Sequence, residues 1–275
     1  MPLRKRIDID NVLRARYNGK GGNMKRIFSV LLCFIVVILL AFYGIGCTDK
    51  TGGEENTIDY SITNEYEVSV SDSKIGVVYE PVSVTPKYGL IFYVGTAIDY
   101  TYYEYLGQAL AKQGYLVVLP KVKMGLAYLL YSDNEPTFEQ YSDVEFFIGG
   151  HSQGGGAAVR RAKENLTKTK GVVLYAPLCY NDDSIKDEGV PTLLIEATSD
   201  GVLTPEMKAD AKTRLPSNRT EYMVNGCHMS FSTMDDDSTL SFFNDGPATK
   251  EEKEAQRSKT IEYTLAFMKT VVLGG

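Results

Sequence analysis

From about residue 65 onward, short apolar runs alternate with longer stretches whose apolar residues recur three or four positions apart. The short runs predict strands and the longer stretches predict helices. The predicted strands are Glu65–Ser71, Lys74–Tyr79, Leu90–Val94, Leu116–Leu119, Glu145–Gly149, Gly171–Tyr175, Thr192–Glu196 and Glu221–Val224. The predicted helices are Tyr100–Gln113, Gly154–Asn165, Pro205–Thr213 and Thr249–Thr270, the last opened by a capping box of Thr249 and Glu252.

Apolar strands separated by helices predict an α/β fold. We expect a mostly parallel central sheet of about eight strands, with helices on both faces. The first two strands are expected to pair as an antiparallel edge. The sequence shows no internal repeat and no insertion long enough for a large lid domain. We therefore predict one catalytic domain over residues 65–275.

One predicted strand runs directly into Gly150-His151-Ser152-Gln153-Gly154, a G-x-S-x-G sequence, and a helical pattern follows at once. This layout is typical of a nucleophile elbow, in which the serine sits at the apex of a sharp strand-to-helix turn. The two glycines leave space where a Cβ would crowd the turn. The N–H of Gln153 lies at the helix N-terminus, so it is a candidate donor to an oxyanion.

A serine hydroxyl becomes a good nucleophile only when a base accepts its proton. The chain contains two histidines. His151 is adjacent to Ser152 on the turn, where neighbouring side chains point in different directions. His228, which follows a short strand and a glycine turn, is therefore the predicted base. Asp200, just past another apolar strand, is the predicted orienting acid.

Simpler interpretations exist for each of these residues. Asp200 and Gly201 could form only a turn, and His228 could be a hydrogen-bonded loop histidine. Glu196 is an alternative acid, although it lies within its strand pattern. The triad is favoured because Ser152, Asp200 and His228 each follow an apolar strand, and ligand sites in α/β sheets form at the carboxyl ends of strands. The order Ser, Asp, His is that of the α/β-hydrolases.

Further motifs occur at Gly89–Thr96, Tyr102–Gly114, Tyr115–Pro120, Lys123–Ala127, Thr198–Pro205 and Asn225–His228. With the elbow, they resemble the small α/β-hydrolases of the fold-5 type, which are similar to dienelactone hydrolases. The resemblance extends from about Ile75 to Val272. It implies serine-dependent hydrolysis by Ser152, Asp200 and His228. It also implies a second oxyanion donor just after the strand at 90–94, either Thr96 or Ala97. Many relatives carry a glycine where this chain has Thr96, but a backbone N–H requires no particular side chain.

The N-terminal region predicts export. Lys25-Arg26 precede the uncharged and mostly apolar stretch 27–46, which ends at Cys47, so residues 24–46 are predicted to be a signal peptide or membrane anchor. Gly44-Ile45-Gly46-Cys47 resembles a bacterial lipobox with Cys47 as the lipidation site, although Gly44 stands where a Leu-like residue is usual. The alternatives are an uncleaved anchor, since roughly 20 apolar residues can span a bilayer, and free secretion. Each places the catalytic domain outside the cytoplasmic membrane.

Two further segments flank this region. Residues 1–23 fit no signal peptide, and the stretch from Lys20 to Met24 can be encoded by a purine-rich ribosome-binding sequence followed by a start codon. We therefore expect Met24 to be the true start and residues 1–23 to be an artefact of gene prediction. Residues 47–64 are largely polar, with Gly and Glu enriched near their start, and predict a tether.

Charge excludes some classes of partner. Residues 1–46 hold eight of the 29 basic and two of the 35 acidic residues, so the remainder has 21 basic and 33 acidic residues and a net charge of −12. Such a charge argues against nucleic acid and against electrostatic docking to anionic lipid. We expect a monomer that acts on a small-molecule acyl substrate.

The cysteines suggest no metal chemistry. Of four cysteines, Cys33 lies in the apolar stretch and Cys47 is the candidate lipid site. Cys179 and Cys227 each follow a strand, and a disulfide between them stays open because the predicted location is oxidising. Neither has neighbours with metal-ligand spacing, so we expect no metal site and no cofactor.

The sequence therefore predicts a serine hydrolase that cleaves a carboxylic ester or a related acyl bond. Ester, thioester, lactone and simple amide stay open as substrates, because one fold hosts many chemistries. The competing hypothesis is a surface-anchored binding protein that has kept the fold without catalysis. The presence of Ser152, Asp200 and His228 weighs against it.

Overall fold

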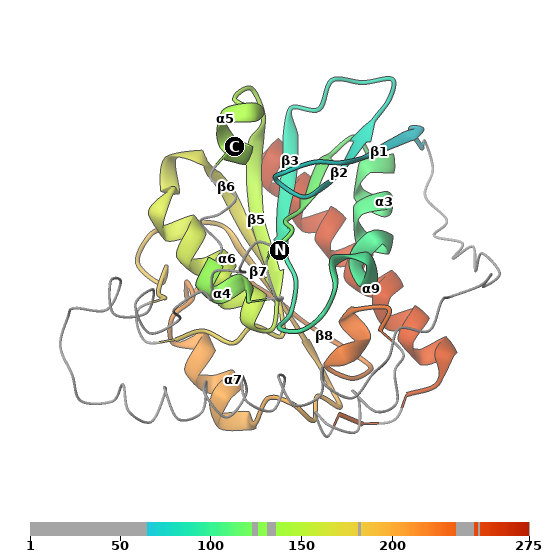
Figure 1. Ribbon diagram of the computed structural model, residues 1–275. Helices are drawn as coiled ribbons and strands as arrows, with labels where there is room; N and C mark the ends of the chain where they lie inside the picture. Colours follow the sequence, from blue (N-terminus) through green and yellow to red (C-terminus); the bar gives the residue numbers. More distant parts are fainter. Residues whose placement is uncertain are drawn as a thin grey trace, which may run out of the picture. The chain divides into compact units, whose positions relative to one another are not determined.

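The computed structural model describes residues 65–122, 126–130, 136–180, 183–234, 245–246 and 248–274 (Figure 1). They belong to the second of the two units into which the chain divides, Asn56–Gly275. The predicted segments 1–23, 24–46 and 47–64, and with them Cys47, lie outside the described residues.

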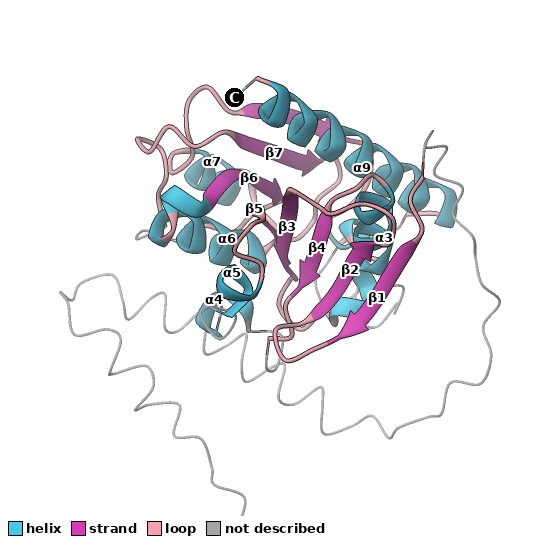
Figure 2. Ribbon diagram, turned by 90° about the horizontal axis from the view of Figure 1, so that it is seen from above, coloured by secondary structure: helices cyan, strands magenta, loops and turns pink. Residues whose placement is uncertain are grey.

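Eight strands form one sheet. Their order across the sheet is β1-β2-β4-β3-β5-β6-β7-β8 (Figure 2). β1 and β2 are antiparallel, as are β2 and β4, and every later pair is parallel. The strands are β1 Val68–Asp72, β2 Val77–Pro81, β3 Tyr88–Tyr93, β4 Leu116–Leu119, β5 Glu145–His151, β6 Thr169–Tyr175, β7 Thr192–Ala197 and β8 Thr220–Val224.

Helices cover both faces of this sheet. Figure 2 shows α3 and α9 on one face and α4, α5, α6 and α7 on the other. None of the helices within the described ranges is long and apolar enough to cross a membrane. The α-helices are α3 Glu104–Lys112, α4 Ala127–Leu130, α5 Pro136–Gln140, α6 Gln153–Glu164, α7 Pro205–Lys212 and α9 Lys250–Leu273, and the 3₁₀ turns are η1 Tyr100–Tyr103, η4 Leu166–Lys168 and η5 Met229–Phe231.

The core has two layers because the central strands are buried on both faces. One layer packs Phe92 and Tyr175 against α3 and α9, with Leu106 and Phe267 among its helix residues. The other packs Ile148 and its neighbours against α6. Full burial of one such side chain contributes about 1.5–3 kcal/mol. This two-sided burial explains why the inner strands read as nearly continuous apolar runs.

The predicted fold class is confirmed. All eight predicted strands are present, and β1 and β2 form the expected antiparallel edge. Thr249 and Glu252 form the expected capping box of α9. The predicted helix 100–113 begins with one 3₁₀ turn, and the Asp99 side chain caps it by accepting the N–H of Thr101. The four- and five-residue helices α4 and α5 were not predicted, since each is too short to show a helical period.

The topology fixes where a site can form. The chain passes from β3 outward to β4 and then returns to β5 on the other side of β3, so strand order reverses between β3 and β5. Ligand sites in open α/β sheets lie at such a switch point, beyond the carboxyl ends of the strands. Ser152 follows β5 at this point and Thr96 follows β3. The described residues contain no inserted lid domain.

Candidate active site

Ser152 occupies a strained turn between β5 and α6. Its φ of 54° and ψ of −124° place it outside the regions that L-residues favour. Its N–H donates to the carbonyl of Tyr175 at 3.0 Å, and its carbonyl accepts from Gly155 at 2.9 Å and Leu178 at 2.8 Å. These bonds hold the turn while the Ser152 side chain stays partly exposed.

The flanking glycines are required by close backbone contacts. A Cβ at Gly150 would lie 2.2 Å from the carbonyl oxygen of Gly154. A Cβ at Gly154 would lie 2.2 Å from the carbonyl oxygen of Tyr93 and 2.4 Å from that of Val94. The elbow therefore packs directly on the end of β3, which the sequence could suggest only as a crowded turn.

Backbone strain is concentrated at this edge of the sheet. Among the described residues, the non-glycine residues with positive φ are Ala97, Ser152 and Ala176. They follow β3, β5 and β6, three neighbouring strands. Each such residue costs on the order of 1–3 kcal/mol, and such costs gather at functional sites.

Asp200 and His228 meet at the same edge, from the turns after β7 and β8. Nδ1 of His228 lies 3.1 Å from Oδ2 of Asp200. Oδ1 of Asp200 accepts the N–H groups of Val202 at 3.0 Å and Leu203 at 2.9 Å. The side chains of both residues are almost fully buried. The structure thus brings together the acid and the base that the sequence suggested.

The environment keeps Asp200 ionised. Burial acts to raise the pKa of this carboxyl, but the hydrogen bond and charge of His228 oppose it, together with the N–H of Leu203 and the Lys208 ammonium. The net result lowers the pKa to about 2. Lys208 Nζ lies 3.6 Å from Oδ2. The carboxylate can therefore orient and stabilise a positively charged imidazole at neutral pH.

Glu196, the alternative acid, is engaged elsewhere. It lies within β7 with its side chain buried, and Lys212 Nζ is 2.6 Å from its carboxylate. This ion pair satisfies Glu196 on the strand itself. Asp200 is thus the carboxylate that His228 contacts.

The two predicted oxyanion donors lie side by side. The hydroxyl of Thr96 donates to Oε1 of Gln153, which joins the turn after β3 to the first residue of α6. Gln153 occupies the first turn of α6, where backbone N–H groups have no partner within the helix. Thr96 and Gln153 therefore lie close together beside Ser152, and their N–H groups stay the predicted oxyanion donors. Ala97, the other candidate donor, adopts a positive φ of 60°.

His151 packs against the ring of His228, the predicted base. Its ring is fully buried, and its centroid lies 4.6 Å from that of His228. Its Nδ1 is 2.6 Å from the hydroxyl of Tyr103, which also accepts the N–H of Gly95 at 3.3 Å. Burial first, and then the charge of His228, hold the pKa of His151 well below its ordinary value, so the ring is neutral.

His151 links Ser152, its neighbour in the chain, to His228 in space. Ser152 is the residue next to His151, whose ring contacts that of His228. The structure forms no hydrogen bond between the Ser152 hydroxyl and His228, both of which it describes. Catalytic hydrogen bonds are often loose in the resting enzyme and tighten when substrate binds. The catalytic roles of Ser152, Asp200, His228, Gln153 and Thr96 stay predictions.

A comparison with protein families identifies the chain. A family model described as the alpha/beta hydrolase family matches residues 89–238. The chain belongs to the α/β-hydrolase family. The matched segment extends from β3 past His228, so it includes Ser152 and Asp200. A search of curated proteins found no match to this hydrolase.

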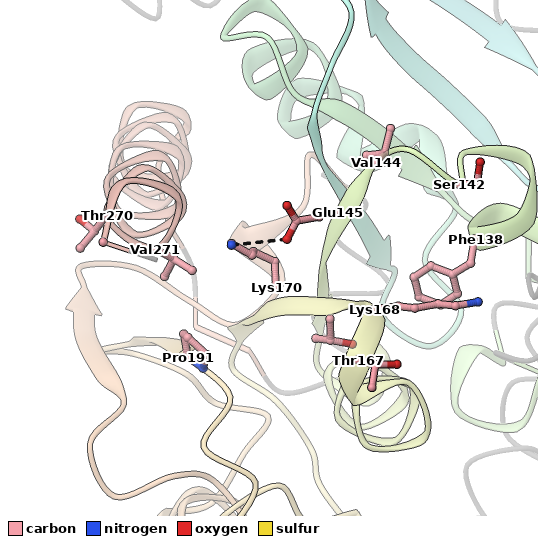
Figure 3. Close-up of a pocket in the computed structure, with 12 residues that line it drawn as sticks. Phe138, Ser142, Val144, Glu145, Thr167, Lys168, Lys170, Pro191, Thr270 and Val271 are labelled. Carbon is pink, nitrogen blue, oxygen red and sulfur yellow. Dashed lines mark ion pairs between the residues drawn. The ribbon is translucent and has the colours of Figure 1, made fainter.

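A cavity of about 660 Å³ lies at the other end of the sheet of this α/β-hydrolase (Figure 3). Residues at the start of β5 and β6, among them Glu145 and Lys170, line this cavity, whereas Ser152 follows the end of β5. Glu145 and Lys170 form an ion pair at 3.4 Å across its wall. Because this cavity opens at the amino ends of the strands, it is separate from the candidate active site.

The remaining cysteines take no part in the site. Cys179 and Cys227 are both free and buried, so the disulfide that the sequence left open is not formed. Burial is the first cause that raises the pKa of Cys179, to about 12, and it also raises that of Cys227. Both side chains are therefore thiols at neutral pH. No cluster of metal-ligating side chains occurs in the part of the chain that the structure describes.

Some residues of the site escaped sequence reasoning. Asp245 and Gln256 come from a loop and a helix, and each contacts the turn that carries His228. No local pattern marks them, because each is distant in the chain from the residues it contacts. The only usable signal was that they are polar residues beside predicted strand ends or on a predicted helix.

Proposed function

We propose that this α/β-hydrolase is a serine hydrolase that cleaves a carboxylic ester or a related acyl bond through an acyl-enzyme. The observation that supports the chemistry is the 3.1 Å bond between His228 and Asp200, at the same sheet edge as the strained turn of Ser152. A depressed Asp200 pKa and a neutral, buried His151 leave His228 as the group suited to accept a proton.

Acylation would begin when the oxygen of Ser152 attacks the carbonyl carbon. Nε2 of His228 takes the hydroxyl proton, and Asp200 accepts a hydrogen bond from Nδ1–H and stabilises the imidazolium without itself being protonated. The carbonyl oxygen becomes an oxyanion that receives the N–H groups of Gln153 and Thr96. The carbon–oxygen bond of the ester then breaks, and the alcohol leaves with the proton from His228.

Deacylation would follow the same path with water as the nucleophile. His228 takes a proton from water while the hydroxide forms a bond to the acyl carbon. The Ser152–acyl bond breaks, the serine regains its proton from His228, and the carboxylic acid leaves. No redox partner or metal is needed to balance either step.

Covalent labelling tests this proposal. A fluorophosphonate probe should modify wild-type protein at Ser152 and should not modify Ser152→Ala. A chromogenic ester should be hydrolysed by the first protein and not by the second. Absence of labelling together with absence of turnover for wild type would favour the alternative function, a non-catalytic binding protein on an α/β-hydrolase scaffold.

We propose in addition that the catalytic domain is held outside the cytoplasmic membrane. The support is the sequence alone: Lys25-Arg26, the apolar stretch 27–46 and Cys47. Expression of the full chain in a bacterial host should yield a membrane-bound protein whose N-terminal peptide carries lipid on Cys47. For Cys47→Ser, retention in the membrane without lipid would indicate an uncleaved anchor instead.

A further inference from the structure

Asp245 connects the two turns that carry the proposed acid and base. Its Oδ1 accepts the N–H of Gly201 at 3.0 Å and the N–H of His228 at 3.2 Å. Its Oδ2 accepts the N–H of Met229 at 2.7 Å. Gly201 follows Asp200 directly, so one carboxylate contacts the backbone beside the acid and the backbone of the base itself.

This arrangement differs from that of the acid Asp200. The oxygens of Asp245 are committed to backbone N–H groups, whereas Asp200 presents one oxygen to the imidazole. A carboxylate that accepts several N–H groups forms charge-assisted bonds, which are about twice as strong as neutral ones. Asp245 therefore holds the spacing between the turns after β7 and β8.

A second side chain holds the base turn from another side. Gln256 of α9 is buried, its Oε1 accepts the N–H of Cys227 at 3.0 Å, and its Nε2 donates to the Cys227 carbonyl at 2.9 Å. Gln256 thus ties the base turn to α9. Asp245 joins the base turn to the turn of Asp200, where the Thr198 hydroxyl also accepts the N–H of Gly226 at 3.3 Å, but of these two side chains Asp245 is the one that contacts the backbone of His228 itself.

We propose that Asp245 is a positioning residue that holds His228 in register with Asp200 and so preorganises the triad. The inference rests on the proposed function, since it concerns the same base. Asp245 lies outside the segment that the family model matches, which ends at residue 238. A misplacement of about 1 Å at a catalytic group can lower the rate on the order of 100-fold.

The test compares Asp245→Ala and Asp245→Asn with the wild-type protein on a chromogenic ester. Asp245→Ala removes all three bonds, and we expect kcat to fall by about 10- to 100-fold with KM changed little, since Asp245 contacts the triad rather than the substrate. Asp245→Asn keeps an acceptor for Gly201 and His228 but turns an amide donor toward Met229. It should therefore show a smaller loss of kcat.

Glu252→Ala is the matched control. Glu252 also accepts a backbone N–H, that of Thr249 at 2.7 Å, but at the exposed start of α9. Its removal should lower stability through the loss of one such bond while leaving kcat unchanged. Thermal unfolding of all variants separates loss of fold from loss of positioning.

Two further readouts distinguish positioning from general damage. The proton NMR signal of His228 Nδ1–H, assigned by its absence in His228→Asn, should shift or broaden in Asp245→Ala and stay unchanged in Glu252→Ala. In an Asp200→Asn background, Asp245→Ala should lower kcat little further, because both residues act through the orientation of His228.

The outcomes separate this inference from the proposed function. If Ser152→Ala abolishes turnover but both Asp245 variants keep the wild-type kcat and NMR signal, the positioning role is wrong while the hydrolase proposal stands. If Asp245→Ala does not fold, the Asp245→Asn result decides. If wild type neither reacts with the probe nor hydrolyses esters, the proposed function fails, and an unchanged NMR signal in the variants would still overturn the positioning role.

Discussion

Asp200 is a buried carboxylate that its surroundings keep charged. Its side chain has no exposed surface, yet two backbone N–H groups, the His228 ring and the Lys208 ammonium surround the carboxylate. Because its pKa falls from 3.8 to about 2, its contribution to stability is complete above about pH 4 and is lost as the pH falls toward 2. The Asp200 carboxylate is therefore charged at neutral pH.

Substitution of the triad tests these roles one residue at a time. Ser152→Ala and His228→Ala should each remove most activity, and the double variant should be scarcely worse, because the three groups act as a unit. Asp200→Asn should keep the fold and lower kcat by up to roughly 10⁴-fold, since the imidazole then adopts the wrong tautomer. Steady-state rates on one chromogenic ester compare all four variants with the wild type. A near-wild-type His228→Ala would contradict the assignment.

His151 makes stability depend on pH. Its pKa in the folded protein lies well below the ordinary value of 6.5. Below pH 6.5 the His151 ring is therefore protonated in the unfolded chain while it stays neutral in the folded protein. The free energy of unfolding should therefore be at its full value above pH 6.5. It should decrease as the pH is lowered from 6.5, by up to about 1.4 kcal/mol per pH unit. His151→Asn, which keeps an acceptor for Tyr103, should flatten this slope in urea titrations at pH 5–8. Equal slopes for both proteins would show that another group is responsible.

At the scale of elements, the site is made by turns that follow β3, β5, β7 and β8. The strands are parallel in this region, so their carboxyl ends meet at one edge, and the register aligns them: His151 pairs with Tyr175, and Ala197 with Val224. The turn that carries Ser152 and the turn after β3 are in contact because Gly154 approaches the end of β3. A change at one turn therefore affects its neighbour.

Gly154→Ala tests this contact between elements. The new methyl group would overlap the carbonyl oxygens of Tyr93 and Val94, which are backbone atoms with little freedom to move. We expect a loss of about 1–3 kcal/mol of stability from overpacking, with a fall in kcat as the turn carrying Thr96 is displaced. Urea denaturation and ester hydrolysis measure the two effects. Wild-type stability in this variant would show that α6 can shift without cost.

At the scale of the whole molecule, the sheet edge that carries Ser152 has no lid domain within the described ranges, and Ser152 is partly exposed. Short water-soluble esters should therefore be hydrolysed faster than long-chain triglycerides. Rates should also show no jump as substrate passes its solubility limit. A series of esters of increasing acyl length measures this. Activity confined to emulsified long-chain lipid would contradict an open site.

Sequence patterns alone were sufficient for the fold class and the order of its elements. Apolar runs indicate strands that are buried on both faces, and the G-x-S-x-G sequence indicates a turn in which a Cβ would clash. Each of these sequence patterns is a local consequence of packing. Asp200 and His228 were predicted for a similar reason, since each follows a buried strand and parallel strands end together.

Only the tertiary structure decided which side chains hold these residues in place. Glu196 and Asp200 were both candidate acids in the sequence, and in the structure the first pairs with Lys212 and the second with His228. His151 lies against His228, and Asp245 and Gln256 hold the base turn, although no local pattern links them. Such contacts join residues far apart in the chain, and they depend on distances of a few ångströms that are set by the packing of whole elements. The sequence by itself determined which reactive side chains follow each strand, and the packing of the sheet and helices determined which of these side chains contact one another.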